Sequence, residues 1–241
     1  MNVFEHHRAR TTFEEWSAAD CKTFFPAFSD GLITTPEITY QNHEGFSDYK
    51  GKTLMLIGGG PSANNDWDSN KYDYLWSINH FFKNEKLKNF HVHLAMIMGE
   101  PDIESTEFID YRNKYNPFIG FEIHDRWENH KFDDYKKYFC MHTRFYGRLG
   151  AGARMKIFAA QLGFDKVYFT GFDGPEAIFD GDHAFEPGKT TLPGIFQNLH
   201  VDNVSYFWKN QYEHLWEYIH TLYPDTKFIN IGGGQKYHEK A

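Results

Sequence analysis

The segment that most constrains the fold is Lys52–Ser62, KTLMLIGGGPS, in which a short apolar run ends in three glycines, a proline and a serine. The run is too short for a globular helix and is bounded by turn residues, so it predicts a buried strand of a parallel sheet. Gly58–Gly60 predict a sharp turn whose backbone N–H groups lie open to a ligand. After Pro61, Ser62 is placed to cap a helix that begins near Ala63.

A buried strand, a glycine turn and a helix N-terminus together predict a nucleotide-binding unit, because the N–H groups at a helix start attract anions. Gly58, Gly60 and Ala63 fit the GxGxxG/A pattern of such units. The same pattern also occurs in tight turns that bind no ligand. A purely structural turn is therefore the alternative hypothesis.

The rest of the chain has the composition of one α/β domain. Its 241 residues, 41% of them hydrophobic, are enough to bury a substantial core. We expect residues 51–241 to form a nucleotide-binding domain and residues 1–50 to form an arm packed on it. The net charge of −8 argues against nucleic acid as a partner. The aromatic share of 19% supplies many flat faces for stacking on a base or a sugar.

No apolar run reaches the length of about 18–20 residues that a membrane helix needs, and the N-terminus lacks the apolar stretch of a signal peptide. Cys21 and Cys140 are the two cysteines and have no CxxC spacing, so neither a disulfide framework nor a cysteine zinc site is predicted. We therefore expect a soluble cytoplasmic protein, and peripheral attachment at the inner membrane stays open.

Strands and helices alternate along the domain. Further strands are predicted at Tyr74–Asn79, His91–Met98, Phe118–Ile123, Lys166–Thr170 and Lys227–Ile231. Helices are predicted from Glu100 to Asn116, from Gly150 to Leu162 and from Asn203 to Tyr223, and Asp125–Tyr138 is predicted as a surface helix or an excursion over the site. This order favours a single Rossmann-like domain with a mainly parallel sheet and flanking helices.

Two strand ends carry polar side chains that suit a nucleotide. In a Rossmann unit an acidic residue about 20 residues beyond the first glycine binds the ribose, but here this place is held by Asn79. An amide both donates and accepts hydrogen bonds, which suits a pyrimidine base or a ribose and fits NAD poorly. A strand-end turn is the alternative role. Gly171 and Asp173 follow the strand Lys166–Thr170, at the edge where open α/β sheets bind ligands.

The segments around that strand are expected to complete the site. Gly150, Ala151 and Gly152 open a predicted helix, and their small size permits a ligand to approach its N-terminus. Residues 181–189, GDHAFEPGK, predict a mobile, glycine-punctuated lid.

Several segments, in this order, resemble the family 42 glycosyltransferases, the bacterial sialyltransferases that use CMP-sialic acid. GGGPS at 58–62 is similar to the family's GNGPS, and INHFF at 78–82 is similar to its CNQFYF. RLGAG at 148–152, QLGFDKVYFTGFDGP at 161–175 and HAFE at 183–186 are similar to its RITSG, ALGYKEIYLSGIDFY and YAFD. The resemblance covers roughly residues 52–231. It implies a metal-independent, single-domain, Rossmann-like enzyme of the GT-A-variant type.

Carried over position by position, the resemblance implies that Asn79 binds cytidine. Gly59 stands where the family has an asparagine, so only backbone contacts are implied there. The two tyrosines that hold the departing phosphate correspond to Pro175 and His183. Proline has no donor for this task, whereas His183 offers a hydrogen bond and, when protonated, a positive charge.

The resemblance also implies the remaining site residues. Gly150-Ala151 replaces the Thr-Ser pair that receives the sialic acid carboxylate, and Arg148 is expected to face phosphate or sugar. A histidine after the lid is the family's general base, and its counterpart by position is His200, just before the helix that contains Trp208. A neutral imidazole suits proton abstraction. His183 and His214 are the alternatives for this role.

The favoured hypothesis is transfer of a sugar from a nucleotide-activated donor, a CMP-sugar above others, to a hydroxyl of a glycan or small molecule without a metal. Asp180 and Asp182 form a DxD motif, which holds a divalent cation in metal-dependent glycosyltransferases, and such a site is the minority alternative. The same glycine-proline-serine strand end occurs in motility accessory factors and a hydroxymethylpterin pyrophosphokinase. A pyrophosphokinase-like enzyme or a non-catalytic nucleotide-binding protein is therefore the second hypothesis, and a homo-oligomer stays open.

Overall fold

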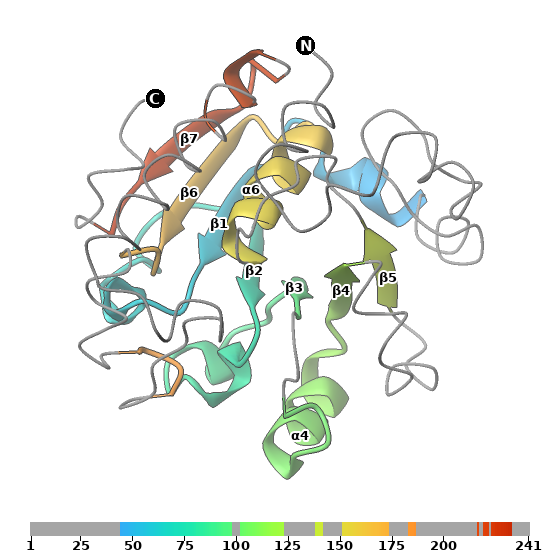
Figure 1. Ribbon diagram of the computed structural model, residues 1–241, viewed down its shortest axis with the longest axis vertical. Helices are drawn as coiled ribbons and strands as arrows, with labels where there is room; N and C mark the ends of the chain where they lie inside the picture. The colour runs from blue at the N-terminus through green and yellow to red at the C-terminus, as the bar shows by residue number, and fades with distance from the viewer. Residues whose placement is uncertain are drawn as a thin grey trace, which may run out of the picture.

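The computed structural model describes residues 44–97, 102–122, 138–141, 151–173, 183–186, 216, 219–221 and 223–232. In this part of the chain seven strands form one parallel sheet in the order β5-β4-β3-β2-β1-β6-β7 (Figure 1). The strands are β1 (Thr53–Ile57), β2 (Tyr74–Ile78), β3 (Leu94–Met96), β4 (Phe118–Glu122), β5 (Tyr138–Met141), β6 (Lys166–Thr170) and β7 (Lys227–Asn230). The predicted α/β class and parallel sheet are confirmed.

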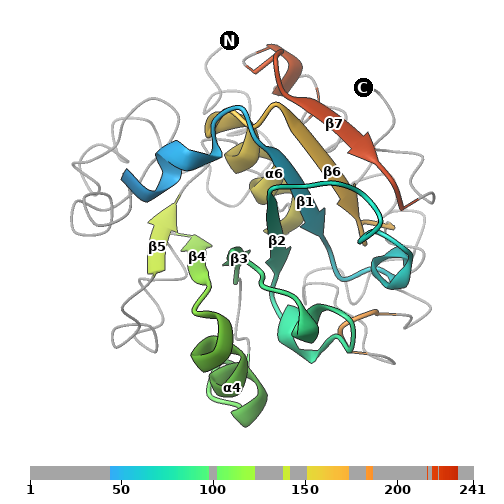
Figure 2. The ribbon, with the colours of Figure 1, turned by 180° about the vertical axis from the view of Figure 1, so that it is seen from behind.

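Two α-helices and four short 3-10 helices have both of their ends within the described residues. They are η1 (Glu44–Tyr49), η2 (Pro61–Asn64), η3 (Phe81–Lys83), η4 (Leu87–Asn89), α4 (Thr106–Tyr115) and α6 (Ala151–Gln161). Figures 1 and 2 show α6 lying on one face of the sheet, whereas α4 packs against η3. No helix within the described ranges is both long and apolar enough to cross a membrane.

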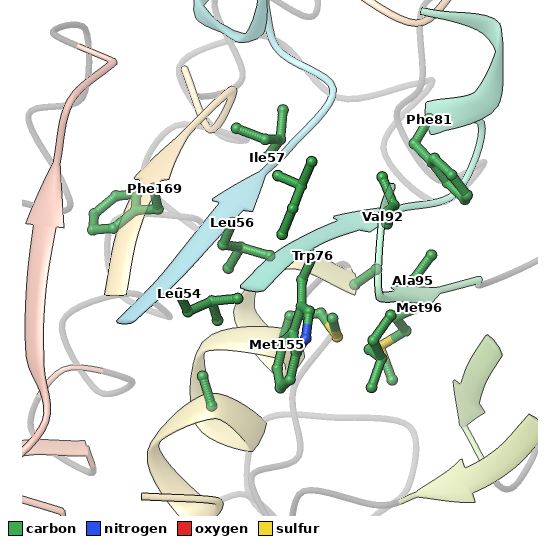
Figure 3. Packing of buried hydrophobic residues seen from close by; sticks show 14 of the residues in the cluster. Leu54, Leu56, Ile57, Trp76, Phe81, Val92, Ala95, Met96, Met155 and Phe169 are labelled. Carbon is green, nitrogen blue, oxygen red and sulfur yellow. The ribbon is translucent and has the colours of Figure 1, made fainter. Parts of the chain in front are cut away.

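β1 lies inside the sheet, between β2 and β6. Leu54, Met55, Leu56 and Ile57 are fully buried, as expected for a strand covered on both faces. Leu56 is in register with Trp76 of β2, and Figure 3 shows these side chains within the core. This burial confirms the strand predicted from the apolar run before the glycines.

α6 also contributes many residues to the core. Its residues from Ala151 to Ala160 are buried, and Phe158 stacks on Trp76 with ring centroids 5.6 Å apart. Gly163 follows the helix with a φ of +76°, a left-handed conformation that suits glycine at a helix end. The helix predicted from Gly150 to Leu162 is thus confirmed.

α4 is shorter than the helix predicted from Glu100. Ser105 is its N-cap, since its hydroxyl accepts a hydrogen bond from the Phe108 N–H at 3.3 Å. At the other end Asn116 adopts a left-handed conformation with φ of +47°. Both boundaries follow from capping residues rather than from the apolar pattern.

Two strand predictions needed correction. β3 covers Leu94–Met96, so His91–His93 and Ile97 of the predicted strand lie outside it. β5 was not predicted as a strand, and it begins at Tyr138, the last residue of the segment predicted as a surface helix or excursion. The Asn203–Tyr223 helix lies mostly outside the described residues, of which Trp216 and residues 219–221 are helical.

Most of the predicted arm also lies outside the described residues. Its last part is η1, from which Phe46 and Tyr49 are buried in the core. Phe46 contacts Phe158 edge-on at 5.5 Å, and Tyr49 contacts Trp76 at 5.4 Å.

A buried lysine in α6 predicts a pH-dependent stability. The Lys156 side chain is fully buried, with its Nζ 4.1 Å from the ring centroid of Phe169 and 4.3 Å from that of Phe172. Burial lowers the pKa of Lys156 well below its ordinary value. The unfolded chain therefore binds a proton that the folded chain gives up, and stability falls as the pH drops from the unfolded pKa toward the folded one.

We expect Lys156→Met to raise the free energy of unfolding at pH 7 by at least about 1 kcal/mol, because it removes the cost of a buried amine at similar volume. The gain should shrink as the pH approaches 10, and urea unfolding at several pH values measures it. A loss of stability that is equal at every pH would contradict this account.

Candidate functional site

The candidate site lies where the chain reverses its direction of travel through the sheet. From β1 the chain moves outward through β2 to β5, and then returns to the other side of β1 with β6 and β7. Open α/β sheets bind ligands beyond the carboxyl ends of the strands at such a point. Gly58–Ser62 after β1, Asn79 after β2 and Gly171–Asp173 after β6 all lie at this edge.

The turns after β1 and β6 lie against each other. The Gly58 N–H donates to the Thr170 carbonyl at 2.8 Å, and the Gly60 N–H donates to the Gly171 carbonyl at 2.7 Å. A Cβ at Gly58 would overlap the Gly171 carbonyl oxygen, and a Cβ at Gly171 would overlap the Gly58 carbonyl oxygen. The glycines are thus required for the close approach of two backbones.

Ser62 does not cap a helix as predicted. Pro61–Asn64 forms one 3-10 turn, its N-cap is Gly60, and no side-chain cap bond is present. The buried Ser62 hydroxyl instead accepts a hydrogen bond from the Gly171 N–H at 2.8 Å. A Cβ at Gly232, after β7, would come within 2.6 Å of this hydroxyl oxygen. Ser62 therefore connects the ends of the strands.

Asp173 places a carboxylate on the glycine turn. Its Oδ2 accepts a hydrogen bond from the Ser62 N–H at 2.9 Å, and a Cβ at Gly60 would overlap this oxygen. The N–H groups of Gly58, Gly60 and Ser62 are thus bonded within the protein. These three groups of the predicted phosphate cradle are therefore already bonded and a 3-10 turn takes the place of the predicted helix, while nucleotide binding at this turn stays a prediction.

Asn79 forms the end of β2 with a left-handed backbone. Its φ is +47°, a conformation that asparagine adopts more readily than most residues. Its N–H donates to the Met96 carbonyl of β3 at 2.8 Å. This turn explains an asparagine here without a ligand, so its contact with a nucleotide stays a prediction.

The segment from His183 to Glu186 is docked on the glycine turn. The Ala184 N–H donates to the Gly59 carbonyl at 2.8 Å, and the Ala184 and Phe185 side chains are buried. The described part of the predicted lid thus contacts the glycine turn in this structure, and its mobility stays a prediction.

The His183 imidazole occupies the space beside Gly59. A Cβ at Gly59 would overlap the His183 Nε2. The other ring nitrogen, Nδ1, accepts hydrogen bonds from the N–H groups of Phe185 at 3.3 Å and Glu186 at 3.2 Å. Because Nδ1 uses its lone pair as an acceptor, the proton of the neutral ring lies on Nε2. This geometry favours a hydrogen-bond donor at the turn over the alternative role of His183 as a base.

An ionic network holds the far end of the same segment. Glu186 lies 2.9 Å from the Nδ1 of His80 and 3.4 Å from the Nζ of Lys83, which is also 3.3 Å from Asp102. Desolvation lowers the pKa of Lys83, but the two carboxylates more than offset it and raise this pKa above its ordinary value. The network joins the turn after β2, the segment before α4 and the docked segment.

Sequence reasoning missed Asn84, which follows η3 and is buried to 2% exposure. Its Nδ2 donates to the Asn64 Oδ1 at 3.0 Å and to the Ala184 carbonyl at 2.9 Å. Its Oδ1 accepts from the N–H groups of Lys86 and Leu87, both at 3.0 Å. Asn84 stands among charged residues, in FFKNEKL at 81–87, so no local pattern marked it as buried.

The small residues at the start of α6 serve packing. Ala151 and Gly152 are buried, and a Cβ at Gly152 would overlap the Phe172 ring. The Phe172 ring thus requires a glycine at 152, and the approach of a ligand to this helix start stays a prediction.

Several predicted site residues lie outside the described ranges, namely Arg148, Gly150, Pro175, Asp180, Asp182, His200 and His214. Within those ranges no cluster of three or more metal-ligating side chains occurs.

No protein-family model and no curated protein matches this chain in sequence. Solved structures do match. The sialyltransferase CstII from Campylobacter jejuni, in complex with the substrate analogue cytidine-5'-monophosphate, aligns with a TM-score of 0.50 and 15% identity over 75% of this chain and 80% of that chain. A tyrosine-to-phenylalanine variant of Cst-II in complex with CMP aligns with a TM-score of 0.51 and 15% identity, over 74% of this chain and 80% of that chain. The monofunctional α-2,3-sialyltransferase Cst-I from Campylobacter jejuni aligns with a TM-score of 0.51 and 14% identity, over 74% of this chain and 75% of that chain.

The chain has the fold of these sialyltransferases. The fold implied by the sequence resemblance is thereby confirmed.

The neighbours of Gly58 and Gly59 predict different responses to alanine. Gly58→Ala pushes a Cβ into backbone and should lower the free energy of unfolding by about 1–3 kcal/mol, whereas Gly59→Ala pushes it into the tip of the His183 side chain, which shifts at a lower cost than backbone. Urea unfolding of both variants measures the difference. An equal or larger loss for Gly59→Ala would contradict the assigned packing.

Proposed function

We propose that this chain is a glycosyltransferase that moves a sugar from a nucleotide-activated donor, a CMP-sugar above others, to a hydroxyl acceptor. The observation that carries the proposal is the position of Asp173 and His183, which lie against Gly60 and Gly59 of one glycine turn. The turn belongs to a fold shared with sialyltransferases whose structures contain CMP.

Asp173 gives the glycine turn a preference for hydroxyls. A carboxylate repels a phosphate and accepts hydrogen bonds from the 2′- and 3′-hydroxyls of a ribose. Because Asp173 already holds the Ser62 N–H with Oδ2, its position is fixed before a ligand arrives. We assign the ribose to this side of the turn, over Gly58, Gly60 and Gly171.

The base and the phosphate then extend from the ribose in different directions. Asn79 ends β2, the strand next to β1, and its amide can pair with the amino and carbonyl groups of cytosine. His183 lies at Gly59 and offers its Nε2–H to the phosphate. A fixed donor aimed at the oxygen where charge develops lowers the barrier to departure of CMP.

In the transfer step an acceptor oxygen forms a bond to the anomeric carbon of the sugar while the bond from that carbon to the phosphate oxygen breaks. His200 takes the proton of the acceptor hydroxyl, and CMP leaves with the bonding electrons, its charge held by His183. Arg148 and the start of α6, from Gly150 to Gly152, are assigned to the sugar and phosphate. We propose that the step needs no metal, with a cation at Asp180 and Asp182 as the alternative.

The preference of the chain for one nucleotide is tested by calorimetry, which measures the affinities for CMP, UDP, GDP and ATP, each with and without Mg²⁺. CMP should bind more tightly than the other three, and Mg²⁺ should not change its affinity. Binding of ATP alone, and only with Mg²⁺, would overturn the proposal in favour of a pyrophosphokinase-like enzyme.

The role of His200 as the general base is tested by His200→Ala. The control is His91→Ala, at an exposed histidine before β3. General-base catalysis contributes about 10²–10⁴-fold, so His200→Ala should lower kcat in a transfer assay by that factor and leave the Kd for CMP within about twofold. His91→Ala should change neither value. Turnover of His200→Ala equal to that of the unmodified chain would refute the role of His200.

A further inference from the structure

Asn84 is a buried amide whose hydrogen-bonding capacity is fully used. An asparagine side chain has two N–H donors and two acceptor lone pairs, and all four are engaged here: the donors by Asn64 and Ala184, the acceptors by Lys86 and Leu87. A buried amide satisfied in this way has one low-energy orientation, since turning it over would oppose donor to donor and acceptor to acceptor.

The four bonds join three segments of the candidate site. Asn64 ends η2, which directly follows the glycine turn. Lys86 and Leu87 begin η4, beyond the turn after β2. Ala184 belongs to the docked segment, next to His183, and lies about 100 residues from Asn84 along the chain.

The peptide groups of Ala184 are held from both sides. The Ala184 carbonyl accepts from Asn84, and the Ala184 N–H donates to the Gly59 carbonyl. His183 directly precedes this residue, and its Nε2 occupies the space that a side chain at Gly59 would fill. The position of the imidazole on the turn is therefore set by the two bonds at Ala184 and by the ring's own contacts with Phe185 and Glu186.

We propose that Asn84 is a positioning residue that seats His183 on the glycine turn, so that the Nε2–H meets the phosphate of the bound nucleotide. The inference rests on the proposed function for the identity of the ligand. The seat itself is a property of the ligand-free protein and can be tested apart from it.

Asn84→Asp removes the hydrogen-bond donors of this side chain and keeps its acceptors. A carboxylate has almost the same shape and still accepts from Lys86 and Leu87, so the local turn is kept. It cannot donate, and it sets an oxygen against the Ala184 carbonyl and the Asn64 Oδ1. The matched control is Asn89→Asp, which removes one exposed bond to the Glu85 carbonyl, away from the docked segment.

The first readout compares CMP with cytidine, which lacks the phosphate. Asn84→Asp should weaken CMP binding at least about tenfold and cytidine binding less than about twofold, and Asn89→Asp should change neither. In a His183→Ala background, which has already lost the donor, Asn84→Asp should have no further effect on CMP affinity. Equal losses for CMP and cytidine, or a full further loss in the His183→Ala background, would overturn the proposal.

The second readout needs no ligand. Nitrogen NMR of ¹⁵N-histidine-labelled protein, with His183 assigned by its absence in His183→Ala, should show Nδ1 as the acceptor and Nε2 as the protonated nitrogen. In Asn84→Asp this signal should shift toward a mixture of tautomers. An unchanged His183 signal would contradict the proposal that Asn84 positions the His183 ring. If the unmodified chain binds no CMP, the proposed function fails while this measurement still decides the role of Asn84.

Asn64→Ala replaces Asn84→Asp if the latter does not fold. Asn64 is exposed, and the change removes one of the two acceptors of the Asn84 amide. It should weaken CMP binding about threefold and leave cytidine unchanged, whereas no change for CMP would contradict the proposal. Asn64→Asp keeps the acceptor oxygen and serves as its control.

Discussion

The contact on which the rest of the site depends is the close approach of the backbones after β1 and β6. Gly58 and Gly171 lie so near each other that neither tolerates a Cβ, and the N–H groups of Gly58 and Gly60 bond to the carbonyls of Thr170 and Gly171. This approach brings Asp173 to the Ser62 N–H and the Ser62 hydroxyl to the Gly171 N–H. The two strand ends therefore form one rigid unit before any ligand binds.

In this unit the glycine turn differs from that of a Rossmann fold. A Rossmann turn offers its N–H groups to phosphate, but here most of them are bonded within the protein and a carboxylate lies among them. In the function proposed above, a side chain therefore recognises the anion. His183, brought from a segment more than 120 residues away along the chain and braced by Asn84 and by the ionic network at Glu186, is the described residue placed for that task.

The sequence predicted the parts of the fold that depend on local patterns. β1, β6 and α6 have clear apolar periodicity or length, and Gly163 marks a helix end by its own conformational freedom. β5 was missed, because four residues following a charged, aromatic segment give no alternation to count. The site was predicted as a set of positions at strand ends, and Asp173, Asn79 and His183 do lie at that edge.

The functions of individual groups could not be predicted in the same way, because they depend on partners that are distant in the chain. Ser62 reads locally as a helix cap, yet its hydroxyl bonds to Gly171, 109 residues away. Gly59 is explained by His183, and Asn84 by Ala184. No pattern within a short window contains these pairs.

A crystal structure of the chain with CMP tests the central claim most directly, since it locates each part of the nucleotide against a named residue. The account predicts cytosine at Asn79, the ribose hydroxyls at Asp173 and a phosphate oxygen within hydrogen-bond distance of the His183 Nε2. A phosphate bound by the backbone of the glycine turn with Asp173 displaced, or a nucleotide bound away from the β1 and β6 strand ends, would contradict it.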